Sequence, residues 1–142
     1  MKVKDFRSAV NAAVEAWRAS HDTSTLPHGA LPVFYENGPQ PDESKLAYWL
    51  DVELRFYSGH MAEIGEGAGG RSSGVIALSL YWKAGEGTGH LDELLDSLHA
   101  ALRARRIGPA AYTTHGERTI PPPSFYGWYK TGYMIPFVLD ER

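Results

Sequence analysis

The chain has no cysteine, and this absence excludes three kinds of function at once. A disulfide framework, a thiolate metal site and a cysteine nucleophile all require that side chain. Any chemistry that the protein performs must therefore come from other groups.

Long apolar runs and a signal-like start are also missing. A membrane-spanning helix needs roughly 20 consecutive apolar residues, and no segment approaches that length. The first residues, Met1 to Asp5, lack the apolar block and the cleavage site of a signal peptide. We therefore expect no contact with a membrane, and synthesis and folding in a cytoplasm.

An excess of positive charge is absent as well. The formal net charge is -3, whereas nucleic-acid binding depends on Lys and Arg side chains that neutralise phosphates. We expect no direct nucleic-acid specificity, although a local basic patch stays possible.

The size and composition of the chain are those of one ordinary folded unit. A chain of 142 residues can bury about 68 to 70% of the surface that it exposes when unfolded. Hydrophobic residues make up 43% and charged residues 22%, which is typical of soluble globular proteins. We expect a single domain over residues 1–142.

Two segments have the apolar spacing of amphipathic helices. From about Lys4 to Ser20, apolar residues recur every three or four positions. The second segment has its apolar stripe from Leu91 to Leu102, acidic residues in its first turn and Arg103, Arg105 and Arg106 in its last, and Gly108-Pro109 stops it. Both helices should lie on a sheet. The stripe of the first helix consists of Phe6, Val10, Ala13, Val14 and Trp17.

The strands follow from alternation and from β-prone composition. Apolar and polar residues alternate from Tyr48 to Tyr57, and residues 75–82 have the density of a central strand. Two more strands are predicted over residues 111–120 and 127–139, and Pro136 argues for an edge position of the last one. With a short strand at residues 31–37, this predicts an α+β fold: a mainly antiparallel or mixed sheet of about five strands, with two amphipathic helices packed on one face.

The glycine-rich segment Gly59 to Gly74 is predicted to be a loop. Its part from Gly65 to Ser72 resembles a phosphate-binding loop superficially, but lacks the Gly-Lys-Ser/Thr ending and precedes a strand instead of a helix. We expect no nucleotide there. A flexible loop that orders against another subunit is the hypothesis that we prefer for Gly65 to Arg71.

Motifs of catalysis and metal binding are missing. The six histidines show no His-x-His and no i, i+4 pair with an adjacent Glu, and there is no Gly-x-Ser-x-Gly elbow. We predict no catalytic, cofactor-binding or metal site, no cofactor, and a protein that is not an enzyme.

Polar and aromatic residues on the strands indicate contacts instead. Glu53 and Arg55 share the polar face of the strand at residues 48–57, where they could pair across the sheet or bind another subunit. Trp128 belongs to a run of aromatic residues at positions 126–133, and such residues are enriched at protein interfaces.

Four blocks, in this order, also carry a resemblance to a known family. They are the segment Leu31 to Asn37 (Leu-Pro-Val-Phe-Tyr-Glu-Asn), the strand Tyr48 to Tyr57, the strand start Arg71 to Ile76, and the turn Gly85-Glu86-Gly87 before the second helix. From about Val3 to Leu139 the chain resembles small phage tail proteins of the tail terminator type.

The resemblance implies a structural protein of a phage or prophage. Such proteins form a ring, here expected to be a homohexamer, that caps the tail tube, stops its polymerisation and provides the surface to which the head joins. The implied partners are other copies of the chain, the tail tube protein and head-tail connector proteins. The implied location is the virion tail, with assembly in the cytoplasm of the bacterial host.

A ring requires two different patches of one subunit to meet on adjacent copies. Our candidate pair is the polar strand face with Glu53 and Arg55 against the loop residues Glu63, Glu66 and Arg71. We add Trp128 as a candidate for the subunit or tail-tube interface.

Two alternatives stay open. The first is another head-tail joining or minor tail protein. The second, from a different class, is a small-ligand-binding domain or an enzyme that uses the glycine loop and nearby histidines. An assembly near six times the chain mass favours the ring, and a deep polar pocket in a stable monomer favours the second alternative.

Overall fold

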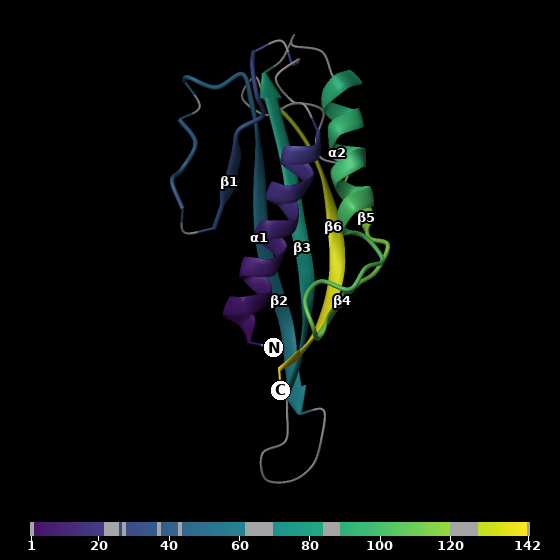
Figure 1. Cartoon of the computed structure of the whole chain (residues 1–142). Helices are drawn as coiled ribbons and strands as arrows, with labels where there is room; N and C mark the ends of the chain where they lie inside the picture. The colour runs from purple at the N-terminus through teal and green to yellow at the C-terminus, as the bar shows by residue number, and fades with distance from the viewer. Residues whose placement is uncertain are drawn as a thin grey trace.

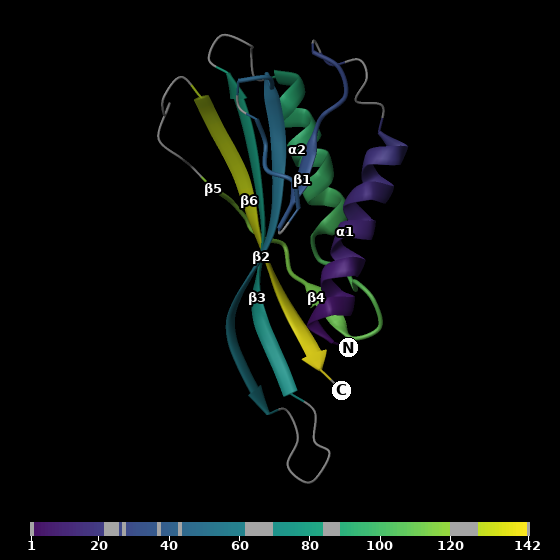
Figure 2. The same ribbon diagram turned by 90° about the vertical axis from the view of Figure 1, so that its left-hand side faces the viewer.

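The chain forms two layers, with a mixed sheet on one side and two helices on the other. The computed structural model describes residues 2–21, 26, 28–36, 38–42, 44–61, 70–83, 89–119 and 128–141. Both helices lie on the same face of the sheet (Figures 1 and 2), so the predicted α+β class is confirmed. The elements are α1 (Val3–Ser20), β1 (Val33–Tyr35), β2 (Tyr48–Met61), β3 (Gly70–Lys83), α2 (Gly89–Leu102), β4 (Ala111–Thr113), β5 (Glu117–Thr119) and β6 (Trp128–Glu141).

The sheet has six strands in the order β1-β2-β3-β6-β4, and β5 also pairs with β6. β1 runs parallel to β2, and every other pairing is antiparallel. The sequence predicted one strand over residues 111–120, whereas the structure has two short ones. Gly116, with a φ of 78°, lies between them. Such a φ breaks a strand, because the extended conformation needs a negative value.

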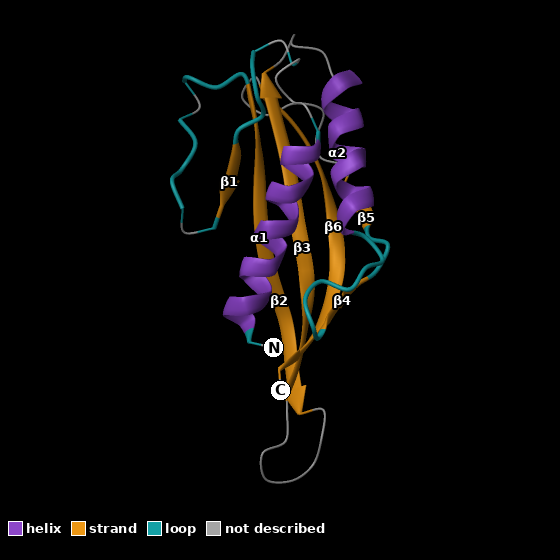
Figure 3. Cartoon of the chain, viewed as in Figure 1, coloured by secondary structure: helices purple, strands orange, loops and turns teal. Residues whose placement is uncertain are grey.

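The core lies between the helices and the sheet (Figure 3). Four of the five stripe residues of α1 are buried and Ala13 is partly buried, and the ring centroid of Phe6 lies 4.5 Å from that of Phe137 on β6. Burial of each large apolar side chain contributes roughly 1.5 to 3 kcal/mol. The core therefore fixes which face of the sheet the helices cover. Its central aliphatic residues on the strands and on α2 are Leu50, Leu78, Leu80, Ile135, Leu95 and Leu98.

The predicted loop Gly59 to Gly74 is shorter than expected. β2 continues to Met61 and β3 starts at Gly70, so that the two strands pair down to Met61 and Gly70 and extend past both chain termini (Figure 1). Residues 62–69 lie outside the described part. Gly74 is a strand residue: a Cβ there would lie 2.0 Å from the carbonyl oxygen of Arg55. This glycine allows close approach of β2, and the sequence analysis wrongly read it as a loop residue.

The edge position predicted for the last strand is wrong. β6 pairs with β3 along its whole length, and β4 and β5 pair with its other side. Pro136 is tolerated there because its carbonyl accepts a hydrogen bond from the Thr114 amide at 3.0 Å. In a strand the N and the carbonyl of one residue face the same side. The missing N–H of Pro136 thus faces the gap between β4 and β5, where no ladder bond is lost.

In the described part of the chain, neither helix is long and apolar enough to cross a membrane.

Candidate interface on the open sheet face

One face of the sheet has no helix on it among the described residues (Figure 2). We call it the open sheet face. Strand alternation brings to it the residues opposite to those of the core, in cross-strand rows such as Trp49, Tyr81 and Lys130. The face is formed by Trp49, Asp51, Glu53 and Arg55 of β2, by Arg71, Ser73, Val75, Ala77, Ser79, Tyr81 and Lys83 of β3, and by Trp128, Lys130, Gly132, Met134, Pro136, Val138 and Asp140 of β6.

An aromatic cluster occupies one end of this face. Trp49 stacks on Tyr81 with ring centroids 4.9 Å apart, and Trp128 meets Trp49 edge-on at 4.6 Å. The ammonium groups of Lys83 and Lys130 lie 5.6 Å and 5.3 Å from the ring centroids of Trp128 and Tyr81. Aromatic and cation–π contacts of this kind hold the rings in place. Trp49 is only 3% exposed and lies beneath the cluster, whereas Tyr81 and Trp128 are partly exposed and form its accessible part.

The structure places Glu53 and Arg55 in the middle of the open sheet face. They form an ion pair along one strand, with 3.1 Å between Arg55 Nε and Glu53 Oε1, and not across the sheet. Both side chains are nearly half exposed. An exposed pair of this kind contributes about 0 to 1 kcal/mol, so it leaves both groups available to a partner.

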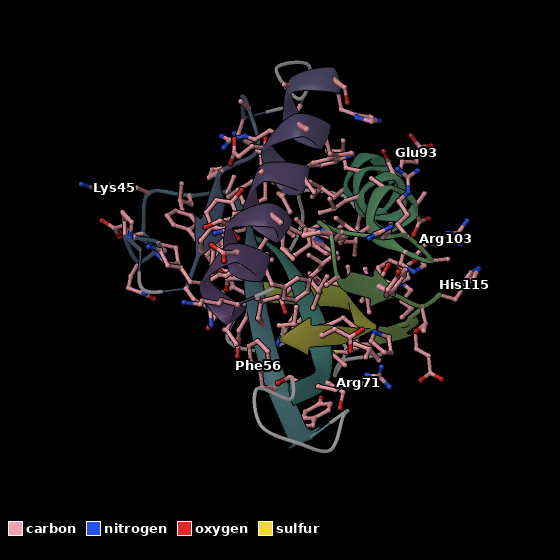
Figure 4. The ribbon with its side chains drawn as sticks, turned by 60° about the horizontal axis from the view of Figure 1, so that its bottom comes forward. Lys45, Phe56, Arg71, Glu93, Arg103 and His115 are labelled. Carbon is pink, nitrogen blue, oxygen red and sulfur yellow. The ribbon has the colours of Figure 1, made fainter. Side chains whose placement is uncertain are left out.

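Arg71 lies at the far end of the same face, near the end where Figure 4 labels Phe56. Its Nε lies 2.7 Å from Oδ1 of Asp140, its cross-strand neighbour on β6. Trp128 lies at the opposite end, beside Lys83. The structure therefore brings four of the six predicted interface residues to one face. The predicted loop position of Arg71, on a patch separate from Glu53 and Arg55, is wrong, because β3 already begins at Gly70. The other two, Glu63 and Glu66, lie outside the described residues.

A cleft of about 200 Å³ opens at the β1 side of the sheet. Glu36 is fixed there by Arg7, whose Nη1 lies 2.7 Å from Glu36 Oε1, an ion pair outside hydrogen-bond angles. The same carboxylate accepts a hydrogen bond from the Leu54 amide, on the side of β2 where β1 has ended. Sequence reasoning did not predict this cleft. Its lining consists of Phe34, Tyr35, Glu36, Gln40, Asp51, Val52 and Glu53.

Asp51 is the least compensated acid of the cleft. Burial raises its pKa, and Trp49 and Lys130 act in the opposite direction. Glu53 has Arg55 and Glu36 has Arg7, but Asp51 has no ion pair of its own among the described residues. Ligand pockets usually measure about 300 to 1,000 Å³. This cleft is smaller, closer to the size of one side chain.

A polar network joins α2 to β5 and β6. The Tyr133 hydroxyl donates to Asp96 at 2.6 Å, and Arg118 contacts Asp92 at 2.7 Å and Asp96 at 3.4 Å. Burial and the Asp96 hydrogen bond raise the pKa of Tyr133. The network ties the helix to the sheet. Sequence reasoning predicted only a helix-dipole role for the acidic residues at the start of α2, because the partner of Asp92 on β5 is distant along the chain.

His99 packs against the same network. Its ring stacks on Tyr133 with centroids 3.9 Å apart, and its Nε2 lies 2.5 Å from the carbonyl oxygen of His115. These contacts explain a buried histidine by packing. Within the described ranges, no group of three or more metal-ligating side chains is assembled.

Comparisons with known proteins show a shared fold. No protein-family model and no curated protein matches the chain. One solved structure has a TM-score of 0.69 and 13% identity, and the match covers 98% of this chain and 96% of that chain. At this identity the likeness shows the fold alone.

Proposed function

We propose that the protein is a structural tail protein of a phage or prophage, a tail terminator that assembles into a ring through side-chain contacts between subunits. The observation that carries the proposal is the open sheet face. It presents the partly exposed rings of Tyr81 and Trp128, packed on the buried Trp49, at one end, and exposed charged side chains beyond them. Aromatic and arginine side chains together are the composition of interface hot spots.

The proposed protein acts by binding and blocking a surface, without a chemical reaction. Copies of the chain form a closed ring, expected to be a hexamer, on the last ring of the tail tube. The bound ring stops addition of further tube subunits and leaves its other side for the head and its connector. A closed ring needs heterologous contacts, and a sheet with two dissimilar edges and one open face offers surfaces that differ from each other.

Electron microscopy of tails made with and without the protein tests this function. We expect tails of defined length when the protein is present and overlong, headless tubes when it is absent. Tails of unchanged length in its absence would overturn the proposal.

Variants connect this test to the open sheet face. Trp128→Ala should weaken the termination of tail tube growth while the protein still folds, because the indole ring lies at the end of the open sheet face. Ser8→Ala is the matched control, since Ser8 is exposed on α1, away from the face. If the two variants restore tail length equally well, the ring of Trp128 does not contribute to the contact.

A further inference from the structure

The two edges of the sheet differ in charge. β1 forms one edge and β4 and β5 lie at the opposite one (Figure 1). The β1 edge holds the cleft with its three carboxylates Glu36, Asp51 and Glu53. The opposite edge carries the arginines that follow α2, which are Arg103, Arg105 and Arg106.

The cleft already uses arginines as partners. Arg7 pairs with Glu36 and Arg55 with Glu53, both within the chain. Asp51 is partly buried and has no ion pair among the described residues: Trp49 and, from a distance, Lys130 favour its charged form, but neither forms a close ion pair with it. A partly buried carboxylate without a close cation is costly, and a guanidinium that reaches it forms charge-assisted hydrogen bonds. The cleft thus has both the volume and the charge for one more cationic side chain.

We call the sheet edge with Arg103, Arg105 and Arg106 the arginine edge. None of its three guanidinium groups has a carboxylate partner in the part of the chain that the structure describes. Arg106 lies over the ring of Tyr112, 5.7 Å from its centroid, and donates to the carbonyl of Pro109. Tyr112 itself is 51% exposed. Arg103 and His115 project at the edge opposite to Lys45 (Figure 4).

The backbone of this edge is closed, so its contacts must use side chains. The Thr113 amide donates to the carbonyl of Arg105 at 2.7 Å, and the Ile107 amide donates to that of Ala111 at 2.9 Å. The segment after α2 thereby covers the outer side of β4. Addition of a partner strand is blocked there, while the arginine side chains stay accessible.

We propose that the cleft at the β1 edge receives an arginine of a second copy, supplied by Arg105 or Arg106 at the opposite edge of that copy's sheet. The contact is heterologous, because the two surfaces differ, and its repetition closes a ring. The inference specifies one contact between neighbouring subunits of the proposed tail terminator ring, and it rests on that proposed function. Arginine suits it because its planar guanidinium binds a carboxylate through two parallel hydrogen bonds.

Charge reversal tests the contact. The double variant R105E/R106E and the single variant D51R should each weaken self-association at least tenfold, measured by mass photometry and sedimentation over a concentration series. A chain that combines all three changes should regain it. The matched control is Lys4→Glu, a reversal on an exposed residue of α1. If the triple variant has the circular dichroism spectrum of the native protein but does not regain self-association, the proposed pairing is overturned.

Cross-linking provides a second test that does not depend on buried charge. Because the chain has no cysteine, single-cysteine variants give no background. Gln40→Cys labels the cleft, and Thr114→Cys labels the other edge without altering its arginines. A short bis-maleimide should link a mixture of the two variants into heterodimers, whereas neither variant alone should link to itself.

The outcomes separate this contact from the proposed function. Self-linking of either variant would indicate a two-fold contact and overturn the inference, as would no link at the highest soluble concentration. The two experiments can also disagree. If the purified variants cross-link as expected but tails made without the protein have normal length, the tail terminator role is rejected and the subunit contact stands. Binding of a small cation in the cleft, with no cross-link, would also overturn it.

Discussion

The two faces of the sheet use the same strands for different purposes, and adjacent residues on β3 show the contrast. Leu80 points to the helices and is 1% exposed, whereas Tyr81 points to the open sheet face and stacks on Trp49. The covered face consists of aliphatic and aromatic side chains that the helices bury. The open face mixes rings with charges. The first face is explained by the stability of the fold, and for the second we propose a contact with a partner.

The largest expected effect comes from the covered face. Leu80→Ala leaves a cavity beneath the helices and should lower the free energy of unfolding by about 2 to 5 kcal/mol. Urea unfolding monitored by circular dichroism measures this loss. A loss below about 1 kcal/mol would mean that the helices do not pack tightly on β3.

The second-largest loss of stability is expected at Gly132, on the open sheet face, where the backbones of two strands approach closely. In Gly132→Ala the new Cβ would lie 2.1 Å from the carbonyl oxygen of Leu78, so β3 and β6 must separate locally. Overpacking of this kind costs about 1 to 3 kcal/mol. Ser79→Ala, at the position paired with Gly132, is the control and should change stability little. Equal stability of both variants would show that the strands can shift freely.

Tyr81→Ala should sharpen the comparison with Leu80→Ala. Loss of its stacking on Trp49 removes about 0.5 to 1.5 kcal/mol, in addition to a modest loss of buried area. The loss in the free energy of self-association should exceed the loss in the free energy of unfolding. Thermal unfolding and mass photometry on the same samples measure both. A variant that assembles normally but unfolds early would assign Tyr81 to folding alone.

The smallest effect concerns Asp51 and pH. Its pKa is raised in the folded chain, so the folded state binds more protons than the unfolded state just above the ordinary carboxyl range of about pH 4. Asp51 therefore favours the fold at low pH, and this contribution is lost as pH rises through its folded pKa. Asp51→Asn should flatten the pH dependence of Tm in that window. An unchanged slope would contradict the assignment.

Periodicity predicted the parts of the fold that depend on neighbours along the chain. The helices, the alternation of β2 and the central position of β3 follow from residues a few positions apart. Gly74 and Pro136 were misread, because their roles depend on which strand lies beside them. A glycine that admits a neighbouring carbonyl has the same sequence signal as a glycine in a loop.

The candidate site was predictable only in part, for the same reason. Glu53 and Arg55 on a polar face follow from alternation, as does an exposed position for part of the aromatic residues. The link from Arg7 to Glu36 and the uncompensated charge of Asp51 arise only when α1, β1 and β2 meet. The Asp92–Arg118 contact likewise joins a helix start to a strand that follows much later.

The place of β6 between β3 and the short strands has a consequence for the order of events during synthesis. β2 and β3 follow each other in the chain and can pair early, whereas β6 is made last of all the strands. Contacts between distant segments form slowly. Until β6 emerges, the side of β3 that it later covers is an unpaired edge beside apolar side chains, open to wrong partners. A ribosome that stalls after α2 would therefore leave the nascent chain in its most aggregation-prone form.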